Sequence, residues 1–275
     1  MVMITHARCL GYDEAQSLVN ALHTILTESE GYEVENGAYF VWQAPNGAQI
    51  WLAMKGGKAE PGSQPAPMEV VDLEPHYNGA GRMQAAVVEM VPYDDEQLTG
   101  ALYAWSSPLS IEDPETGYYP FSVDLRDFST HLHAWRLLPR MVTLQIAAFA
   151  QEAWCFEDEQ IYLQSDHSVL TETEDEETGE LVTLRLAPQA MLPINEGASD
   201  NVAGNYALLT GRIVEVHHLQ NPHTGKGFVA MLVDTYGGSV DVVALEDDIE
   251  GTPYAGGTVK AYAWLSAQVI PTEES

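Results

Sequence analysis

The sequence predicts an α+β protein. We expect an N-terminal mixed α/β domain that is built around a buried helix and is followed along the chain by a small β-barrel. Three observations predict this class. Apolar residues recur at helical spacing near the start, several short runs look like hairpin strands, and the longest apolar run, residues 141–156, is apolar nearly all round. The length of 275 residues suits two domains. We therefore divide the chain into residues 1–195 and 203–275.

The first element is a helix over about residues 13–29. Asp13 has the residue type of an N-cap, and the segment "EGYEVENG" ends the pattern. The apolar positions that repeat at helical spacing are Ala15, Leu18, Val19, Leu22, Ile25 and Leu26.

Strand-like runs follow the helix. Residues 39–43 and 48–54 flank Pro45-Asn46-Gly47, and the Asn-Gly pair supplies the positive φ that a tight hairpin turn needs. Four further runs with strand character cover residues 68–73, 82–91, 98–105 and 118–125. Residues 168–173 and 180–187 form a hairpin around the acidic segment "EDEETG".

The second predicted helix runs from about residue 139 to 156. Pro139 suits the first helical position, because the N–H that proline lacks would have no partner there. Since the segment is apolar nearly all round, we expect this helix in the middle of the N-terminal domain. The polar, glycine-rich residues 192–205 mark the predicted domain boundary.

The C-terminal segment contains "GRIVEV", "FVAMLVDTYGGSVDVVAL" and "GGTVKAYAWL", which read as four strands joined by turns. Over about residues 205–270 this order resembles the OB-fold. The resemblance implies binding of an oligonucleotide or oligosaccharide through stacking aromatic residues and a positive groove. Candidate ligand-binding residues are Phe228, Tyr236, Tyr262, Trp264, Arg212 and Lys226. The pattern lacks a fifth strand before Ser275, so the barrel is open or completed from elsewhere, and few cations line its binding face.

The formal net charge of −30 results from 41 acidic residues against 11 basic ones. Solubility, adaptation to high salt and a basic partner each explain such a charge. Nonspecific binding to nucleic acid should be poor, because Lys and Arg provide most of that affinity. Glu174, Asp175, Glu176 and Glu177 form an acidic run that is either solvated or contacts a basic protein.

Histidines provide the candidate metal ligands. In an extended "HLHAW" segment, His131 and His133 share one face, and Asp124 or Asp127 could add oxygen. A second group, His217, His218 and His223, fits a solvent-facing turn better. The first group has no third nitrogen or sulfur ligand at a recognisable spacing, and in the second His217 and His218 point to opposite faces of a strand, although His218 could meet His223 across the turn. The sequence also contains no Gly-x-Gly-x-x-Gly, P-loop, Gly-x-Ser-x-Gly or His-Glu-x-x-His motif, and we expect no cofactor.

A polar-x-Thr-Gly pattern occurs three times, in "DPETG", "EETG" and "NPHTG". Turn chemistry accounts for these residue types, since Asn or Asp, Pro and Gly each favour one position of a turn. A shared ligand loop and a duplicated β unit are the alternatives.

The two cysteines, Cys9 and Cys155, are too few for a disulfide framework, and both lie in apolar surroundings. The N-terminus lacks the pattern of a secretory signal, and the longest apolar run is too short and too interrupted to span a membrane. We therefore expect a cytoplasmic protein with reduced thiols. The function that fits is a non-enzymatic acidic binding or adaptor protein. Its alternatives are an OB-type binder of single-stranded nucleic acid or oligosaccharide and a metal-dependent enzyme that uses His131 and His133.

Overall fold

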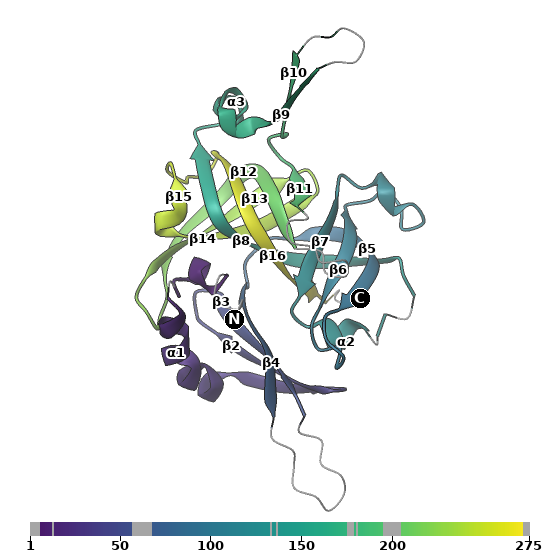
Figure 1. Ribbon diagram of the computed structural model, residues 1–275, viewed down its shortest axis with the longest axis vertical. Helices are drawn as coiled ribbons and strands as arrows, with labels where there is room; N and C mark the ends of the chain where they lie inside the picture. The colour runs from purple at the N-terminus through teal and green to yellow at the C-terminus, as the bar shows by residue number, and fades with distance from the viewer. Residues whose placement is uncertain are drawn as a thin grey trace, which may run out of the picture.

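The computed structural model describes residues 6–12, 14–56, 68–132, 134–135, 137–174, 179, 181–194 and 205–271 (Figure 1). These residues form a mostly β structure with 3 α-helices, so the α+β prediction is wrong. The α-helices are α1 (Ala15–Glu28), α2 (Phe128–Leu132) and α3 (Glu159–Gln164). Figure 1 shows two bodies of β-strands side by side, with a smaller sheet and α1 against them.

The smaller sheet is antiparallel and has the order β1-β2-β3-β4. Its strands are β1 (Glu30–Val34), β2 (Gly37–Gln43), β3 (Ala48–Lys55) and β4 (Glu69–Tyr77). The predicted β2–β3 hairpin is confirmed, and Gly47 takes the positive φ of 91° that the turn requires. Helix α1 is also confirmed. Its buried Leu18 and Ile25 pack in one apolar cluster with Trp42 of β2, whereas Asp13 lies outside the described residues.

The remaining long strands belong to one ten-stranded sheet. Its strands are β5 (Met83–Pro92), β6 (Gly100–Ser106), β7 (Pro120–Leu125), β8 (Arg140–Phe156), β11 (Met191–Ile194), β12 (Tyr206–Gln220), β13 (Gly227–Thr235), β14 (Gly238–Leu245) and β16 (Thr258–Ile270), with the short β15 (Ile249–Glu250) paired to β8. The predicted hairpin is confirmed as β9 (Val169–Glu174) and β10 (Leu181–Arg185), and it forms a two-stranded sheet separate from the ten-stranded one. Among the described residues, no helix combines the length and the apolar character needed to cross a membrane.

This sheet closes on itself twice. In the second barrel, β12, β13, β14, β8 and β16 pair in that order, and β16 pairs again with β12. In the first barrel, β5, β6, β7, β16 and β8 pair in that order, and β8 pairs again with β5. The long strands β8 and β16 are therefore common to both barrels, and closure leaves neither barrel with an open edge.

The two barrels repeat one pairing pattern. β5, β6, β7 and β8 occupy in the first barrel the places that β12, β13, β14 and β16 occupy in the second. In each barrel the third strand runs parallel to the strand supplied by the other unit: Asp124 of β7 lies beside Ser266, and Asp241 of β14 lies beside Ala147. Ser266 and Ala147 also pair with each other. The structure is therefore an internally duplicated β unit, repeated about this central pair.

The segment predicted as a buried helix is strand β8, which corrects the central element of the predicted fold. Ala147 to Ala150 are all fully buried, because Ala148 and Ala150 face the barrel core while Ala147 and Phe149 pack in the apolar cluster that includes α1 and the four-stranded sheet. A strand buried on both faces shows no alternation of apolar and polar residues, so its sequence resembles that of a buried helix. The same strand provides the fifth strand of the second barrel, and the ten-stranded sheet thus extends across the boundary predicted at residues 192–205.

Two of the three Thr-Gly segments are described in full, and both act as turns. In "NPHTG" the side-chain oxygen of Asn221 accepts hydrogen bonds from two backbone N–H groups, and Gly225 has a φ of 70°. In "DPETG" the backbone of Gly117 is extended (φ −66°, ψ 165°). A Cβ at this position would lie only 2.5 Å from the carbonyl oxygen of Ser106, so the close approach requires glycine. These two turns join different pairs of strands, so they do not mark the duplication. In "EETG", only Gly179 lies within the described residues.

Candidate functional site

A pocket of about 310 Å³ lies where the four-stranded sheet meets the first barrel. Its polar lining includes four carboxyl groups and one guanidinium, and three aromatic rings form part of its wall. These residues are Asp72, Glu74, Asp94, Asp124 and Arg126, with Tyr39, Trp51 and Tyr93.

Strand β4 supplies two of the carboxyl groups. In its segment "DLEPH", Asp72, Glu74 and His76 are two residues apart, and side chains at this spacing point to the same face of a strand. Strand β7 supplies Asp124 and is followed at once by Arg126, whose backbone N–H donates to the carbonyl of Ala267 in β16. Two different sheets therefore hold the charged groups of the pocket.

The wall of the pocket is fixed by hydrogen bonds to the backbone. The carboxylate of Asp94 accepts from the backbone N–H groups of Leu98 and Thr99 and from the Thr99 hydroxyl, at 2.6–3.1 Å. The Tyr39 hydroxyl donates to the carbonyl of Leu98 and accepts from the N–H of Ser129. These contacts tie the β5–β6 loop to β2, so the pocket has its shape before any ligand binds.

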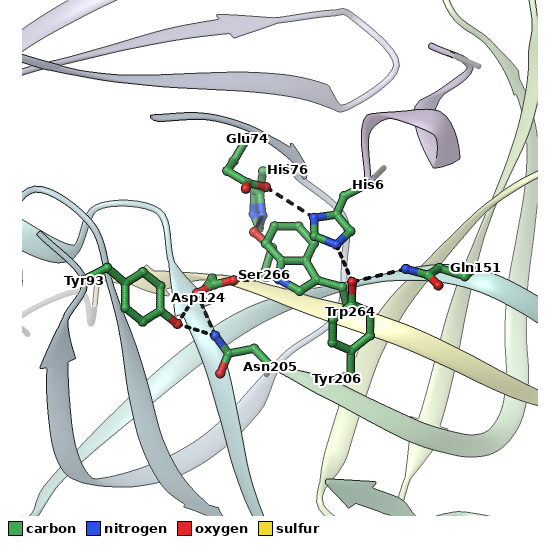
Figure 2. Close-up of polar contacts among 10 residues, drawn as sticks. All are labelled: His6, Glu74, His76, Tyr93, Asp124, Gln151, Asn205, Tyr206, Trp264 and Ser266. Carbon is green, nitrogen blue, oxygen red and sulfur yellow. Dashed lines mark hydrogen bonds and ion pairs between the residues drawn. The ribbon is translucent and has the colours of Figure 1, made fainter. Parts of the chain in front are cut away.

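Asp124 is the most heavily hydrogen-bonded group of the site (Figure 2). Its carboxylate accepts hydrogen bonds from the Tyr93 hydroxyl at 2.6 Å, from Asn205 Nδ2 at 2.7 Å and from Trp264 Nε1 at 2.6 Å. Three donors on three different segments hold a carboxylate in a fixed orientation and favour its ionised form.

The duplication supplies a natural comparison for this site. Asp241 occupies in the second barrel the place of Asp124, and Gln145 donates to it from the place on β8 that corresponds to Trp264 on β16. However, Asp241 also accepts from the backbone N–H of Gly81, and Cβ atoms at Gly79 and Gly81 would lie only 2.2 and 2.9 Å from its carboxyl group. The chain thus seals one carboxylate with backbone, whereas its counterpart Asp124 lines a pocket.

His6 connects this site to the N-terminal segment. Its ring stacks on Trp264 with 4.0 Å between centroids, and its Nε2 shares a 2.8 Å hydrogen bond with the Tyr206 hydroxyl (Figure 2). Its Nδ1 lies 3.5 Å from Oε2 of Glu74, a contact too long for a good hydrogen bond. His76 is fully buried and hydrogen-bonds to the Ser266 hydroxyl and to Oε1 of Gln145, whose Nε2 donates to Asp241.

Burial is the main reason that the carboxyl groups of the pocket hold protons more tightly than usual. It raises the pKa of Glu74 to about 8 and that of Asp124 to about 6, and it also raises the pKa of Asp72. The Arg126 guanidinium lowers the pKa of all three carboxyl groups without offsetting the cost of burial. At pH 7, Glu74 is therefore mostly protonated and Asp124 mostly ionised.

The structure separates the residues that the OB-fold resemblance implied as ligand-binding. Phe228 and Trp264 are only 1% and 3% exposed, so neither ring is available to stack on a base. Tyr236 is exposed and stacks on Tyr118, while Tyr262 stacks on Tyr206. Arg212 and Lys226 lie at opposite ends of the β12–β13 ladder and do not form one groove.

The metal and partner predictions fall partly outside the described residues. His131 hydrogen-bonds to Asp127 at 2.8 Å and lies against Trp135, and His133 is not among the described residues. In the part of the chain that the structure describes, no group of three His, Cys, Asp or Glu side chains could hold a metal ion. Glu174 is exposed at the end of β9, and Asp175, Glu176 and Glu177 again lie outside the described residues.

Sequence reasoning missed the pocket. The one sequence signal for it was the segment "DLEPH" at the end of a predicted strand. There Asp72, Glu74 and His76 alternate with the apolar residues Leu73 and Pro75. Such alternation predicts a polar face, but not the element that covers it. Comparison with known proteins adds no assignment, since no protein-family model, no curated protein and no solved structure matches this chain.

Proposed function

We propose that this chain is a non-enzymatic binding protein, and that the pocket between the four-stranded sheet and the first barrel takes a small ligand with a positively charged amine. The observation that carries the proposal is the set of four carboxyl groups, Asp72, Glu74, Asp94 and Asp124, that line one pocket with a single guanidinium. A β-barrel does not by itself specify a ligand, so the proposal rests on the side chains of the pocket.

The pKa values of the pocket support a cationic ligand. A carboxyl group whose pKa is raised by burial lacks a counter-charge, and a bound ammonium group provides one. The ring of Tyr93, which is 37% exposed, adds an aromatic face to the pocket, and such a face favours an organic cation. The volume of about 310 Å³ is at the lower end for ligand pockets, so the ligand is small.

Titration calorimetry with n-butylamine, using n-butanol as the neutral analogue, tests this function. We expect the amine to bind and the alcohol not to bind. Glu74→Gln should weaken amine binding at least tenfold, because it removes a charge-assisted hydrogen bond worth roughly 1.5–3 kcal/mol. At pH 7.5 binding should also release a proton from Glu74, so the observed enthalpy should vary with the ionisation enthalpy of the buffer.

The control variant is Glu89→Gln, which removes an exposed carboxylate of β5 away from the pocket. It should leave amine affinity unchanged. Equal affinity for n-butylamine and n-butanol, or no binding of any small amine by the folded protein, would remove the basis for this function.

A second candidate function is the adaptor role, in which the acidic surface binds a basic protein. The β9–β10 hairpin projects from the barrels beyond α3 (Figure 1) and pairs with no other described strand. It exposes Leu181 and Leu184 together with Glu172 and Glu174. An exposed hairpin with aliphatic and acidic side chains suits a partner that offers both apolar and basic groups.

A polylysine peptide tests the hairpin. We expect the double variant E172Q/E174Q to weaken its binding several-fold at low salt, because these carboxylates lie beside the exposed aliphatic residues. The matched double variant E30Q/E33Q removes two exposed carboxylates from β1 and changes net charge equally. The same weakening in both pairs would show that net charge alone binds the peptide and would argue against a hairpin site.

A further inference from the structure

The pocket contains two buried polar atoms of opposite character without hydrogen-bond partners among the described residues. They are Oε2 of Glu74 and Nε of Arg126. Both residues line the same cavity, and the Arg126 side chain belongs to a residue that is only 9% exposed. Buried polar atoms normally have a partner, and these two, which belong to residues lining one cavity, can both be satisfied by a ligand in that cavity. The nearest contact of Oε2 among the described residues is with Nδ1 of His6, at 3.5 Å.

The charges of this pocket lie close together without touching. Arg126 is near enough to lower the pKa of Asp72, Glu74 and Asp124. Nevertheless, within the described part of the chain, its guanidinium makes no ion pair shorter than 4.0 Å with a carboxylate. Buried guanidinium and carboxylate groups usually form direct, often bidentate pairs. Here the protein holds them apart across a cavity.

The frame around Arg126 keeps that separation. The Arg126 guanidinium lies 5.2 Å from the ring centre of Trp264, whose Nε1 is bound to Asp124. Glu74 is on β4, which belongs to the other sheet. Glu74 and Arg126 thus reach the cavity from different sheets, and the Trp264 ring lies against Arg126.

We propose that the pocket binds a zwitterion of the α-amino acid class, with its ammonium group at Glu74 and Asp72 and its carboxylate at Arg126. This inference rests on the proposed function and adds the anionic half of the ligand. The planar guanidinium suits a carboxylate, since its N–H groups match the two oxygens. The ring of Tyr93 and the side chain of Val71, which line the same pocket and are not fully buried, provide the surface for an apolar side chain. The ligand bridges charges that the protein leaves apart, which explains both orphaned atoms.

Titration calorimetry of the full chain with matched ligands tests this inference. The probes are leucine and phenylalanine, their decarboxylated amines 3-methylbutylamine and phenethylamine, and the deaminated acids 4-methylpentanoate and 3-phenylpropanoate. We expect at least one amino acid to bind tenfold or more tightly than its matched amine and its matched acid. This comparison uses the unaltered protein and does not depend on how any variant folds.

Arg126→Met assigns the carboxylate to its partner. It should reduce amino-acid affinity at least tenfold, to the level of the matched amine, and leave amine affinity unchanged or higher. The control is Arg140→Met, because Arg140 is exposed and lies over Trp135 at 5.7 Å, much as Arg126 lies over Trp264. This control should change neither affinity.

The possible outcomes separate the two proposals. If the amines bind and neither amino acid binds more tightly, the zwitterion inference is overturned while the proposed amine site stands. If the amino acids bind and Arg126→Met affects them no more than Arg140→Met does, the carboxylate site at Arg126 is wrong. If no amine and no amino acid binds to the folded protein, both proposals fail.

Discussion

Replacement of Trp264 by alanine is expected to lower the free energy of unfolding by roughly 3–5 kcal/mol, the usual cost of removing a large aromatic ring from a core. Trp264 is 3% exposed on β16, the strand common to both barrels. Its ring contacts His6 and lies 5.5 Å from Phe149, and its Nε1 donates to Asp124. The change therefore leaves a cavity and removes a donor from a buried carboxylate. Urea denaturation of the unaltered protein and of the Trp264→Ala variant measures the loss in free energy of unfolding.

Trp264→Phe separates these two contributions. It keeps most of the ring but removes the Nε1 donor, so we expect a smaller loss of roughly 1–3 kcal/mol from the weakened hydrogen bonding of Asp124. The same experiment bears on the alternative of base stacking. A Trp264→Ala protein of unchanged stability that had lost affinity for a single-stranded oligonucleotide would contradict our account and favour the OB-type binder.

Between pH 6.5 and 8 the free energy of unfolding is expected to fall by about 1.5–2 kcal/mol as the pH rises. One proton that is bound only in the folded state gives a slope of about 1.36 kcal/mol per pH unit, and the slope decreases as the pH approaches the pKa of the folded state. Burial raises the pKa of Glu74 from 4.5 to about 8, so the folded state binds a proton in this range that the unfolded state does not bind. A folded state that binds more protons loses stability as pH rises. Thermal or urea denaturation across this range measures the slope.

Glu74→Gln is the variant that isolates this effect. Glutamine does not titrate, so the variant should show a flatter stability profile from pH 6.5 to 8. Below pH 6.5, His6 and His76 should add a slope of opposite sign, so that their effect lowers stability as the pH falls. The reason is that burial lowers their pKa values to about 4 and about 3. Those histidines stay neutral in the folded state, so their contribution to stability is lost as pH falls below 6.5. A slope above pH 6.5 that survives in Glu74→Gln would show that another group is responsible.

Local sequence signals predicted most individual strands. The hairpin at Gly47, helix α1 and the four C-terminal strands were visible because turn residues and apolar periodicity act over a few residues. The same signals identified "NPHTG" as a turn. In the structure Asn221, 1% exposed, also donates to the carbonyl of Leu10, a contact between segments more than 200 residues apart that no local pattern contains.

The identity of β8 was beyond local reasoning. Residues 144–150 are buried on both faces, and a buried helix and a doubly buried strand require the same composition. What decides between them is the presence of partners on either side. Here β14 and β16 flank the middle of the segment and β5 pairs with its start, so the strand becomes the shared wall of two barrels.

The sequence by itself determined the acidic charge, the turns, the first helix and most of the strands, because each of these depends on composition or on neighbours along the chain. Only the tertiary structure decided the duplication of the β unit, the role of β8 and the pocket. Glu74 and Arg126 are 52 positions apart; Glu74 lies on β4 of the four-stranded sheet and Arg126 directly follows β7 of the ten-stranded sheet. The packing of one sheet on the other brings them to one cavity, and burial there, not residue type, sets the pKa values and leaves two polar atoms without a partner.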